Sequence, residues 1–89
     1  MKIYSQEVEK LIITEPKNRL MENVLGLGEE AGEVLGKIKK LIRDKNFSKS
    51  EIIKELGDCL FYVTAIANYL GDDLQAVADA NMAKLKDRK

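Results

Sequence analysis

The residues of this sequence that could do chemistry form two acidic clusters, each set within an apolar helical pattern. The clusters have the forms Glu-Glu-x-x-Glu and Glu-x-x-Asp, and their members are Glu29, Glu30, Glu33, Glu55 and Asp58. Residues three or four apart lie on the same face of a helix, so each cluster projects its acids together. Residues 34–54 are enough to finish one helix, turn, and begin a second helix that runs back alongside it. We therefore expect four or five carboxylates to meet between two antiparallel helices.

Cation binding is the chemistry that these clusters suit, because carboxylates in a confined site raise one another's pKa and cannot all stay ionised without a cation. Ligand sets made only of oxygen suit Mg²⁺, Mn²⁺ or Ca²⁺ better than zinc. The sequence contains no histidine, which excludes the usual zinc triads, Ser-His catalysis and the Glu-x-x-His sites of di-iron bundles. The clusters therefore predict a magnesium site.

A helix from about Leu20 to Arg43 is expected to carry the first cluster. Its apolar stripe consists of Leu20, Leu27, Ala31, Val34, Ile38, Leu41 and Ile42. The acids lie away from the centre of this stripe, with Glu30 nearest its edge. Glu33 and Lys37 are four residues apart, so a solvated, salt-bridged face is an alternative that the spacing on this helix leaves open.

Three glycines recur every fourth residue on the same predicted helix, at Gly28, Gly32 and Gly36. Each glycine costs a helix about 1 kcal/mol relative to alanine. Such a row favours a groove where another helix backbone approaches closely, and simple tolerance of the glycines is the alternative.

A second long helix is expected to follow Ser48, where Ser48-x-x-Glu51 forms a capping box, and to end at Gly71. Its predicted inner face consists of Ile52, Leu56, Cys59, Leu60, Val63, Ile66 and Leu70. No side chain from residue 59 to residue 70 is charged, and a helix that is apolar all round is buried all round. The aromatic residues off the inner face are interpreted as subunit contacts: Phe61, Tyr62 and Tyr69.

The second acidic cluster opens this apolar helix, and its position decides between the two interpretations of the acids. An unpaired carboxylate at the start of a buried helix is costly. Glu55 and Asp58 therefore favour a functional site over a solvated face.

A short helix at the start of the chain follows the helical spacing of Tyr4, Val8 and Leu11. Ser5 is a possible N-cap for it, and it should stop before Pro16, since the residue preceding a proline is pushed out of the α region.

The last helix is expected to begin at Asp72 or Asp73, with Asp72-x-x-Gln75 as a capping box, and to run to about Arg88. Its packing face consists of Leu74, Val77, Ala78 and Leu85. Three polar residues lie on or beside that face, namely Asn81, Lys84 and Arg88. They suit phosphate binding and a frayed, solvated basic terminus equally well from spacing alone.

Length and composition predict one cytoplasmic domain over residues 1–89, of the size that oligomerisation often stabilises. Fifteen basic residues balance fifteen acidic residues, so no basic field indicates a nucleic-acid partner. The single Cys59 excludes an intrachain disulfide and fits a reducing compartment. Neither a signal-peptide core nor an apolar run of about 20 residues is present, so no membrane association is expected.

The expected fold class is all-α, because the sequence has one proline and no runs of alternating β-branched residues. Two long helices form an antiparallel hairpin, shorter helices flank it at both ends, and the uncharged stretch builds an oligomeric four-helix-bundle core.

Residues 23–40 (NVLGLGEEAGEVLGKIKK), 55–62 (ELGDCLFY) and 80–88 (ANMAKLKDR) closely resemble the MazG-like nucleotide pyrophosphohydrolases. These enzymes belong to the all-α nucleoside triphosphate pyrophosphatase superfamily, whose hallmark is Glu-Glu-x-x-Glu followed by Glu-x-x-Asp. The resemblance covers roughly residues 20–88 and is much more specific than either acidic pair alone.

The resemblance implies hydrolysis of a (deoxy)nucleoside triphosphate to a monophosphate and pyrophosphate, in dimers or tetramers with sites between subunits, as nucleotide-pool house-cleaning. By matching positions, Mg²⁺, or Mn²⁺ in its place, would be held by Glu30, Glu33, Glu55 and Asp58. Glu29 would be an additional ligand through water or would orient the attacking water. The nucleotide and its phosphates would meet Lys37, Lys40, Tyr62, Asn81, Lys84 and Arg88.

Two alternatives accompany this hypothesis. One is a non-catalytic helical oligomerisation or metal-binding module. The other is an enzyme of the same superfamily with a different substrate, such as a phosphoribosyl-ATP pyrophosphohydrolase or a dUTPase.

Overall fold

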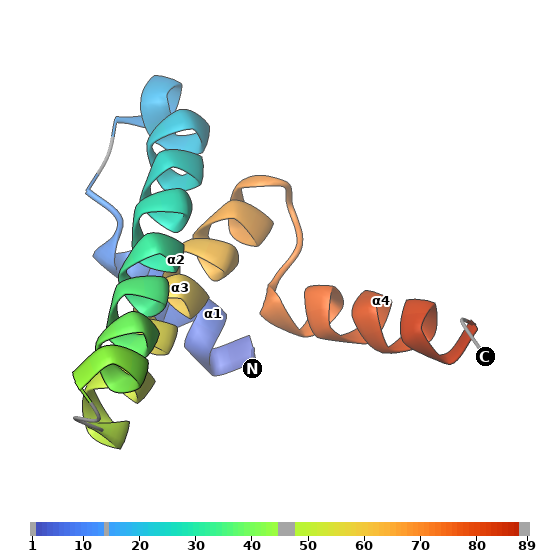
Figure 1. Ribbon diagram of the computed structural model, residues 1–89. Helices are drawn as coiled ribbons and strands as arrows, with labels where there is room; N and C mark the ends of the chain where they lie inside the picture. The colour runs from blue at the N-terminus through green and yellow to red at the C-terminus, as the bar shows by residue number, and fades with distance from the viewer. Residues whose placement is uncertain (1, 14, 45–47, 88–89) are drawn as a thin grey trace.

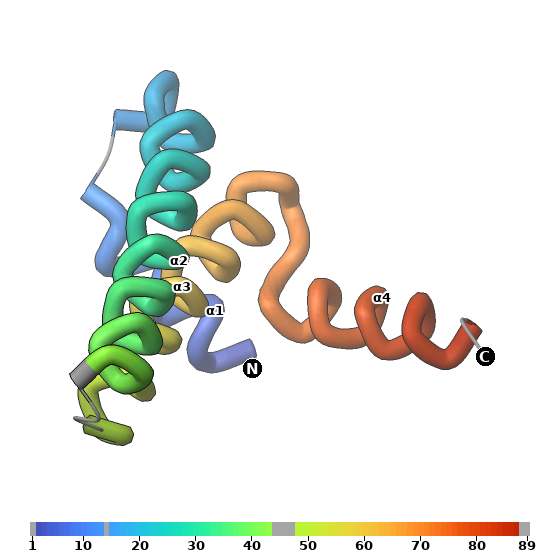
Figure 2. The backbone as a smooth tube through the Cα atoms, in the orientation of Figure 1, coloured from blue at the N-terminus to red at the C-terminus, as the bar shows by residue number. Residues whose placement is uncertain are grey.

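The computed structural model describes residues 2–13, 15–44 and 48–87, and every regular element in these ranges is helical (Figure 1, Figure 2). The elements in chain order are α1 (Lys2–Leu11), the short 3-10 helix η1 (Pro16–Asn18), α2 (Arg19–Asp44), α3 (Lys49–Tyr69) and α4 (Leu74–Asp87). The all-α prediction is confirmed. Each predicted end of the helix that carries the first acidic cluster lies one residue from the observed end of α2.

Helices α2 and α3 run in opposite directions and make the most extensive contact between elements of the described chain (Figure 1). The predicted stripe of α2 contributes half-buried side chains to this contact, among them Leu27, Val34 and Ile38. An ion pair also joins the helices, with the Lys37 Nζ 3.6 Å from the Glu51 Oε2. The antiparallel hairpin predicted from the spacing of the two clusters is therefore present.

The best-buried residues lie where α1, the second half of α3 and the beginning of α4 meet. Val8, Ala65 and Leu74 are almost completely enclosed. A hydrogen bond fixes the start of α4 in this region, because the backbone N–H of Leu74 donates to the Ser5 Oγ over 3.0 Å. Ser5 therefore lies within α1 as a buried acceptor, and the prediction that it caps this helix is wrong.

A small polar network ties α1 to the start of α2 and the end of α3. The guanidinium of Arg19 donates to both carboxylate oxygens of Glu9, and one of these hydrogen bonds is 2.7 Å long. The amide Nδ2 of Asn68 donates to the Ser5 carbonyl over 3.0 Å and to the Glu9 carboxylate over 3.2 Å. These bonds connect residues up to 63 positions apart and fix α1 against the hairpin.

The helix ends differ from the expected capping boxes in their side-chain bonds. Ser48 occupies the N-cap position of α3, as predicted, but its side chain makes no capping hydrogen bond. At α4 the cap is Asp73 rather than Asp72, since the Asp73 Oδ1 accepts the Ala76 N–H over 2.9 Å. Gly71 has a φ of 86°, a left-handed conformation that glycine adopts without strain, and the chain leaves α3 there.

Helix α4 projects away from the hairpin after its first turn (Figure 1). It contacts α3 and α1, and no described residue of α4 contacts α2. Apolar side chains along it stay open to solvent, among them Val77, Met82 and Leu85. A helix that exposes such residues has an uncovered face within the single chain.

Several residues that the sequence assigns to inner faces are also exposed: Leu20, Ala31, Ile42, Leu56, Leu60 and Leu70. A Cβ atom added at Gly28, Gly32 or Gly36 would meet nothing within 4 Å, so no helix approaches this row within the described chain. The oligomeric four-helix core therefore stays a prediction. No helix in residues 2–13, 15–44 and 48–87 is long and apolar enough to cross a membrane.

Candidate metal centre

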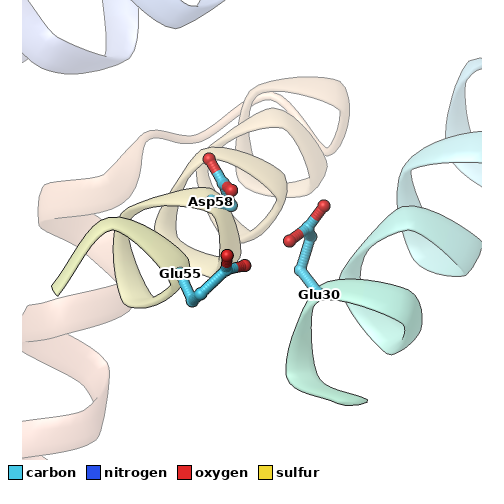
Figure 3. A group of neighbouring side chains, drawn as sticks. All are labelled: Glu30, Glu55 and Asp58. Carbon is cyan, nitrogen blue, oxygen red and sulfur yellow. The ribbon is translucent and has the colours of Figure 1, made fainter. Parts of the chain in front are cut away.

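Three carboxylates from two helices meet on the open side of the hairpin, and we name them the acidic triad: Glu30 of α2 with Glu55 and Asp58 of α3 (Figure 3). One oxygen from each side chain lies within 4.8 Å of the others. Glu55 and Asp58 project together because they are three residues apart on α3, and the antiparallel packing places Glu30 opposite them. The two acidic clusters of the sequence thus meet, but through three carboxylates rather than the expected four or five.

The triad is partly sheltered. Glu30 and Glu55 are half-buried, whereas Asp58 is exposed, so Asp58 lies at the mouth of the site. The pKa of Glu30 is raised above its ordinary value, first because burial disfavours its charge and then because Asp58 and Glu55 repel it. Like charges that hold a pKa up in this way create a site where a bound cation relieves the repulsion.

The spacing of the triad oxygens fits a hard divalent cation. Oxygen ligands lie about 2.1 Å from Mg²⁺, so two ligands on opposite sides of one ion are about 4.2 Å apart. The observed limit of 4.8 Å requires only small side-chain movements to reach that spacing. An all-carboxylate donor set is also the chemistry that Mg²⁺, Mn²⁺ and Ca²⁺ prefer. The residues present therefore fit the predicted type of metal.

The other two acids of the first cluster, Glu29 and Glu33, lie outside the acidic triad. Both are exposed, yet both are close enough that their charges contribute to the raised pKa of Glu30. Their predicted roles, as water-orienting residue and metal ligand respectively, stay predictions.

Among the described residues, the basic side chains predicted to meet phosphates line other parts of the surface than the triad. Lys37 pairs with Glu51, and Lys40 lines the same small hollow between α2 and the start of α3. Asn81 and Lys84 are exposed on α4, which does not contact α2 in the described residues. Arg88 lies outside the residues that the structure describes.

Tyr62 lies on α3 one turn beyond Asp58, and its ring covers the backbone of Gly26 on α2. A Cβ atom at Gly26 would lie 2.5 Å from the Tyr62 Cζ, a distance at which one of the two must move. The sequence pattern assigns Tyr62 to a subunit contact, and the family resemblance assigns it to the nucleotide pocket. In the single chain its ring packs between the two long helices. Its ring also meets that of Phe61 edge to face, with centroids 5.3 Å apart.

An open hollow of about 340 Å³ lies beside Tyr62, and we name it the Asn23 hollow. Its lining consists of Glu22, Asn23, Leu25, Gly26, Glu29 and Tyr62. The sequence prediction did not include Asn23 among the site residues. A signal for it existed, because Asn23 follows Leu20 by three residues and precedes Leu27 by four, which places a polar residue in line with the apolar stripe.

An antiparallel pair of long helices that brings three carboxylates together between them defines a class of all-α protein with an acidic site whose donor set suits a divalent cation. Residues 18–89 match the MazG nucleotide pyrophosphohydrolase domain, which covers most of the chain. The chain therefore belongs to the MazG nucleotide pyrophosphohydrolase domain family, as the resemblance predicted. Members of this family generally depend on a divalent metal.

A relative from Mycobacterium phage L5, the Gene 37 protein, is 40% identical over 70 residues. The alignment covers 73% of this chain and 61% of the phage protein, so the chain spans somewhat less than two thirds of that relative's length. No solved structure matches the chain significantly.

Proposed function

We propose that this chain hydrolyses (deoxy)nucleoside triphosphates to nucleoside monophosphate and pyrophosphate. The observation that carries the proposal is the convergence of Glu30, Glu55 and Asp58 within a MazG domain. The reaction consumes one water and breaks one P–O bond of the phosphoanhydride between the α and β phosphates. The oxygen of water bonds to the phosphorus that is attacked, and the other product leaves with the bridging oxygen. Phosphoryl chemistry of this kind depends mostly on positioning and charge neutralisation.

The acidic triad would hold Mg²⁺, or Mn²⁺ as a substitute, with Glu33 as a fourth ligand one helical turn after Glu30. When bound, the metal supplies positive charge against the phosphates and favours ionisation of water. Glu29 would accept a hydrogen bond from the attacking water and orient it. The half-burial of Glu30 and Glu55 limits the water that competes for these carboxylates.

The phosphates also need cationic partners, and a second copy of the chain would supply some of them. Helix α4 projects from the hairpin with Asn81 and Lys84 exposed and with an uncovered apolar face. In a homodimer, or a tetramer built from dimers, α4 of one subunit would lie against the hairpin of its neighbour. Arg88 would belong to the same group, and Lys37 and Lys40 would meet phosphates from the small hollow between α2 and the start of α3.

A cytoplasmic role in nucleotide-pool house-cleaning completes the proposal, because nucleoside triphosphates are made and consumed in that compartment. Neither nucleic acid nor membrane is a proposed partner. The equal numbers of basic and acidic residues provide no extended positive field for a polyanion.

The decisive experiment measures pyrophosphate release from a panel of nucleoside triphosphates that includes dUTP, together with phosphoribosyl-ATP, with Mg²⁺ and with EDTA. Wild-type chain and Glu55→Gln are compared. Metal-dependent release that disappears in the variant would support the reaction and the site together, and the ranking of substrates would separate a general pyrophosphohydrolase from a dUTPase or a phosphoribosyl-ATP enzyme. Absence of release from every substrate, with intact helical content, would favour a non-catalytic module.

A further inference from the structure

Asn23 is a buried polar residue of α2 whose side-chain amide makes no hydrogen bond within the described chain. Only 4% of the residue is exposed, and its Nδ2 nitrogen is enclosed without an acceptor. An unpaired buried amide reduces the stability of a folded protein, and native proteins leave few such groups without a purpose. A ligand that supplies the missing partner would account for its presence.

The lining of the Asn23 hollow suits the uncharged end of a nucleotide. Besides the amide of Asn23, it contains the aromatic ring of Tyr62 and the carboxylates of Glu22 and Glu29, and no lysine or arginine. A lining without a cation does not favour phosphate groups, and the Glu22 carboxylate can accept hydrogen bonds from N–H and O–H donors. A volume of about 340 Å³ is within the range of small-ligand sites.

The hollow also lies at the right place relative to the acidic triad. The residues concerned follow the spacing i, i+3, i+7 on both helices: Asn23, Gly26 and Glu30 on α2, and Glu55, Asp58 and Tyr62 on α3. Seven residues are close to two helical turns, so Asn23 lies on the same face as Glu30 and about 10 Å along the axis. That separation matches the reach from the phosphates of a nucleotide to its base.

We propose that the Asn23 hollow binds the nucleoside part of the substrate and that the Asn23 amide selects the nucleobase by hydrogen bonding. The inference rests on the proposed function, since it takes the phosphates to lie at the acidic triad. An asparagine amide offers donors and an acceptor side by side, the pattern that distinguishes base edges. The ring of Tyr62 offers an aromatic surface beside the same base.

The test compares amino-bearing with oxo-bearing bases, as ATP against ITP and CTP against UTP, in wild-type chain, Asn23→Asp and Asn23→Leu. An aspartate at this position can only accept hydrogen bonds, so Asn23→Asp should move the ratio of kcat/KM towards the amino-bearing base of a pair by at least tenfold. Asn23→Leu should bring the ratio close to one. Asn18→Asp, which changes an exposed amide outside the hollow, is the matched control and should leave the ratios unchanged.

Unchanged base ratios in both Asn23 variants would overturn the inference while leaving the pyrophosphohydrolase proposal intact. A change in the ratio of ATP to dATP without a change in base preference would assign Asn23 to the sugar and would also overturn it. Both variants must keep the helical content of the wild-type chain, and their Mg²⁺ affinity should be unaltered because Asn23 is outside the acidic triad.

A binding measurement without turnover distinguishes failure of the proposed hydrolysis from failure of the inference about Asn23. Calorimetric titration of AMP, IMP, CMP and UMP into the same variants measures base discrimination whether or not any triphosphate is hydrolysed. Discrimination that depends on Asn23 would uphold the inference for an inactive chain. Equal binding of the four monophosphates to all variants would reject it.

Discussion

Partial burial and repulsion from neighbouring carboxylates both disfavour the charged form of Glu30. It is half-buried, and four other carboxylates contribute to its raised pKa: Asp58, Glu55, Glu29 and Glu33. Because Glu30 faces two acids of α3, its ionised form is less favourable than that of an isolated glutamate, and a bound cation would relieve this repulsion. Metal affinity and proton affinity therefore compete for the same oxygens.

The raised pKa of Glu30 predicts how metal-free stability depends on pH. A raised folded-state pKa means that the folded chain binds more protons than the unfolded chain, so this contribution is favourable below the ordinary value of 4.5 and is lost as the pH rises through the folded pKa. In EDTA, Glu30→Gln should therefore melt at a higher temperature than wild type at neutral pH, with the difference shrinking on acidification. Thermal unfolding at a series of pH values measures it.

Added Mg²⁺ should reverse that order at neutral pH, because a ligand that binds only the folded state raises its melting temperature and the variant binds it more weakly. If wild type and Glu30→Gln responded equally to Mg²⁺, Glu30 would not be a metal ligand.

Asp58 supplies a carboxylate but almost no packing, since it is exposed at the mouth of the triad. Asp58→Asn should lower kcat/KM for pyrophosphate release by about a hundredfold or more, because altering even the residues that support metal ligands costs about 10–100-fold. The melting temperature in EDTA should stay the same or rise. Turnover with titrated Mg²⁺ and thermal unfolding provide the two readouts. Near-normal turnover would place the reaction elsewhere.

The sequence alone predicts which acidic side chains project together, because i, i+3 spacing places carboxylates on one helix face whatever the tertiary structure is. Asn23 was missed because its importance depends on burial and on the absence of a partner, and neither is encoded in local spacing.

The helices position the site through one unusually close approach, where the Tyr62 ring lies on the backbone of Gly26. Glycine weakens a helix interior by about 1 kcal/mol, but here it lets an aromatic side chain fill the space between α2 and α3. One turn away on the same faces lie Glu30, four residues after Gly26, and Asp58, four residues before Tyr62, and both belong to the triad. The packing at Gly26 thus fixes the distance between the two halves of the site.

Gly26→Ala should destabilise the chain by about 1–3 kcal/mol, because the new methyl group overlaps the Tyr62 ring and forces a shift. Gly57→Ala is the matched control, since nothing lies within 4 Å of a Cβ there and the better helix propensity should stabilise by about 1 kcal/mol. Urea denaturation in EDTA measures both. Equal effects of the two substitutions would mean that Tyr62 does not rest on Gly26 in solution.

The ion pair between Glu9 and Arg19 connects α1 to the first residue of α2 and gives a second pH dependence, opposite in sign to that of Glu30. The hydrogen bonds from Arg19 lower the pKa of Glu9, so its stabilising contribution is present above the ordinary value of 4.5 and is lost as the pH falls through the lowered pKa. Because the Glu9 side chain is 48% exposed, solvent screening limits the contribution to about 0.5–1 kcal/mol.

Glu9→Gln should consequently reduce the free energy of unfolding near neutral pH and match wild type in acid. Glu7→Gln is the control, because Glu7 pairs only with Lys10 on the same helix surface and should contribute less. Urea unfolding from pH 7 downwards tests the pair, and a Glu9 effect that persisted in acid would exclude this origin.

Helix existence and length followed from periodicity, whereas several helix-end contacts did not. Ser5 is a capping residue by type but serves the start of α4 across the fold, and Asp73 caps that helix although Asp72 has the more complete sequence motif. A capping motif shows which residues are able to cap a helix, and tertiary contacts decide which of them does so.

At the scale of the whole molecule, the single chain leaves two apolar surfaces uncovered, one on the hairpin and one on α4. The hairpin exposes apolar residues such as Leu56 and Leu60 and gathers three carboxylates. Helix α4 exposes an apolar face together with Lys84 and makes no contact with α2 in the described residues. The apolar periodicity of the sequence identified these helix faces but not the segments that cover them. An apolar stripe shows that a face is buried, and it does not show whether the same chain or a second copy buries it. Pairing of two copies would cover both apolar faces and could bring Lys84 of one copy close to the carboxylates of the other.

Subunit mixing tests whether the site is shared between copies. If α4 of one subunit completes the site of another, Glu55→Gln and the double variant Asn81→Ala/Lys84→Ala should each be nearly inactive alone. Dissociating and reassembling them in equal amounts places both defects in one site of each mixed dimer and leaves the other site intact. About a quarter of wild-type activity should then return, since half of the dimers are mixed and half of their sites are whole. A mixture no more active than the average of its parents, in a preparation whose sedimentation proves exchange of subunits, would mean that each chain builds its site alone and that Asn81 and Lys84 do not meet the substrate across an interface.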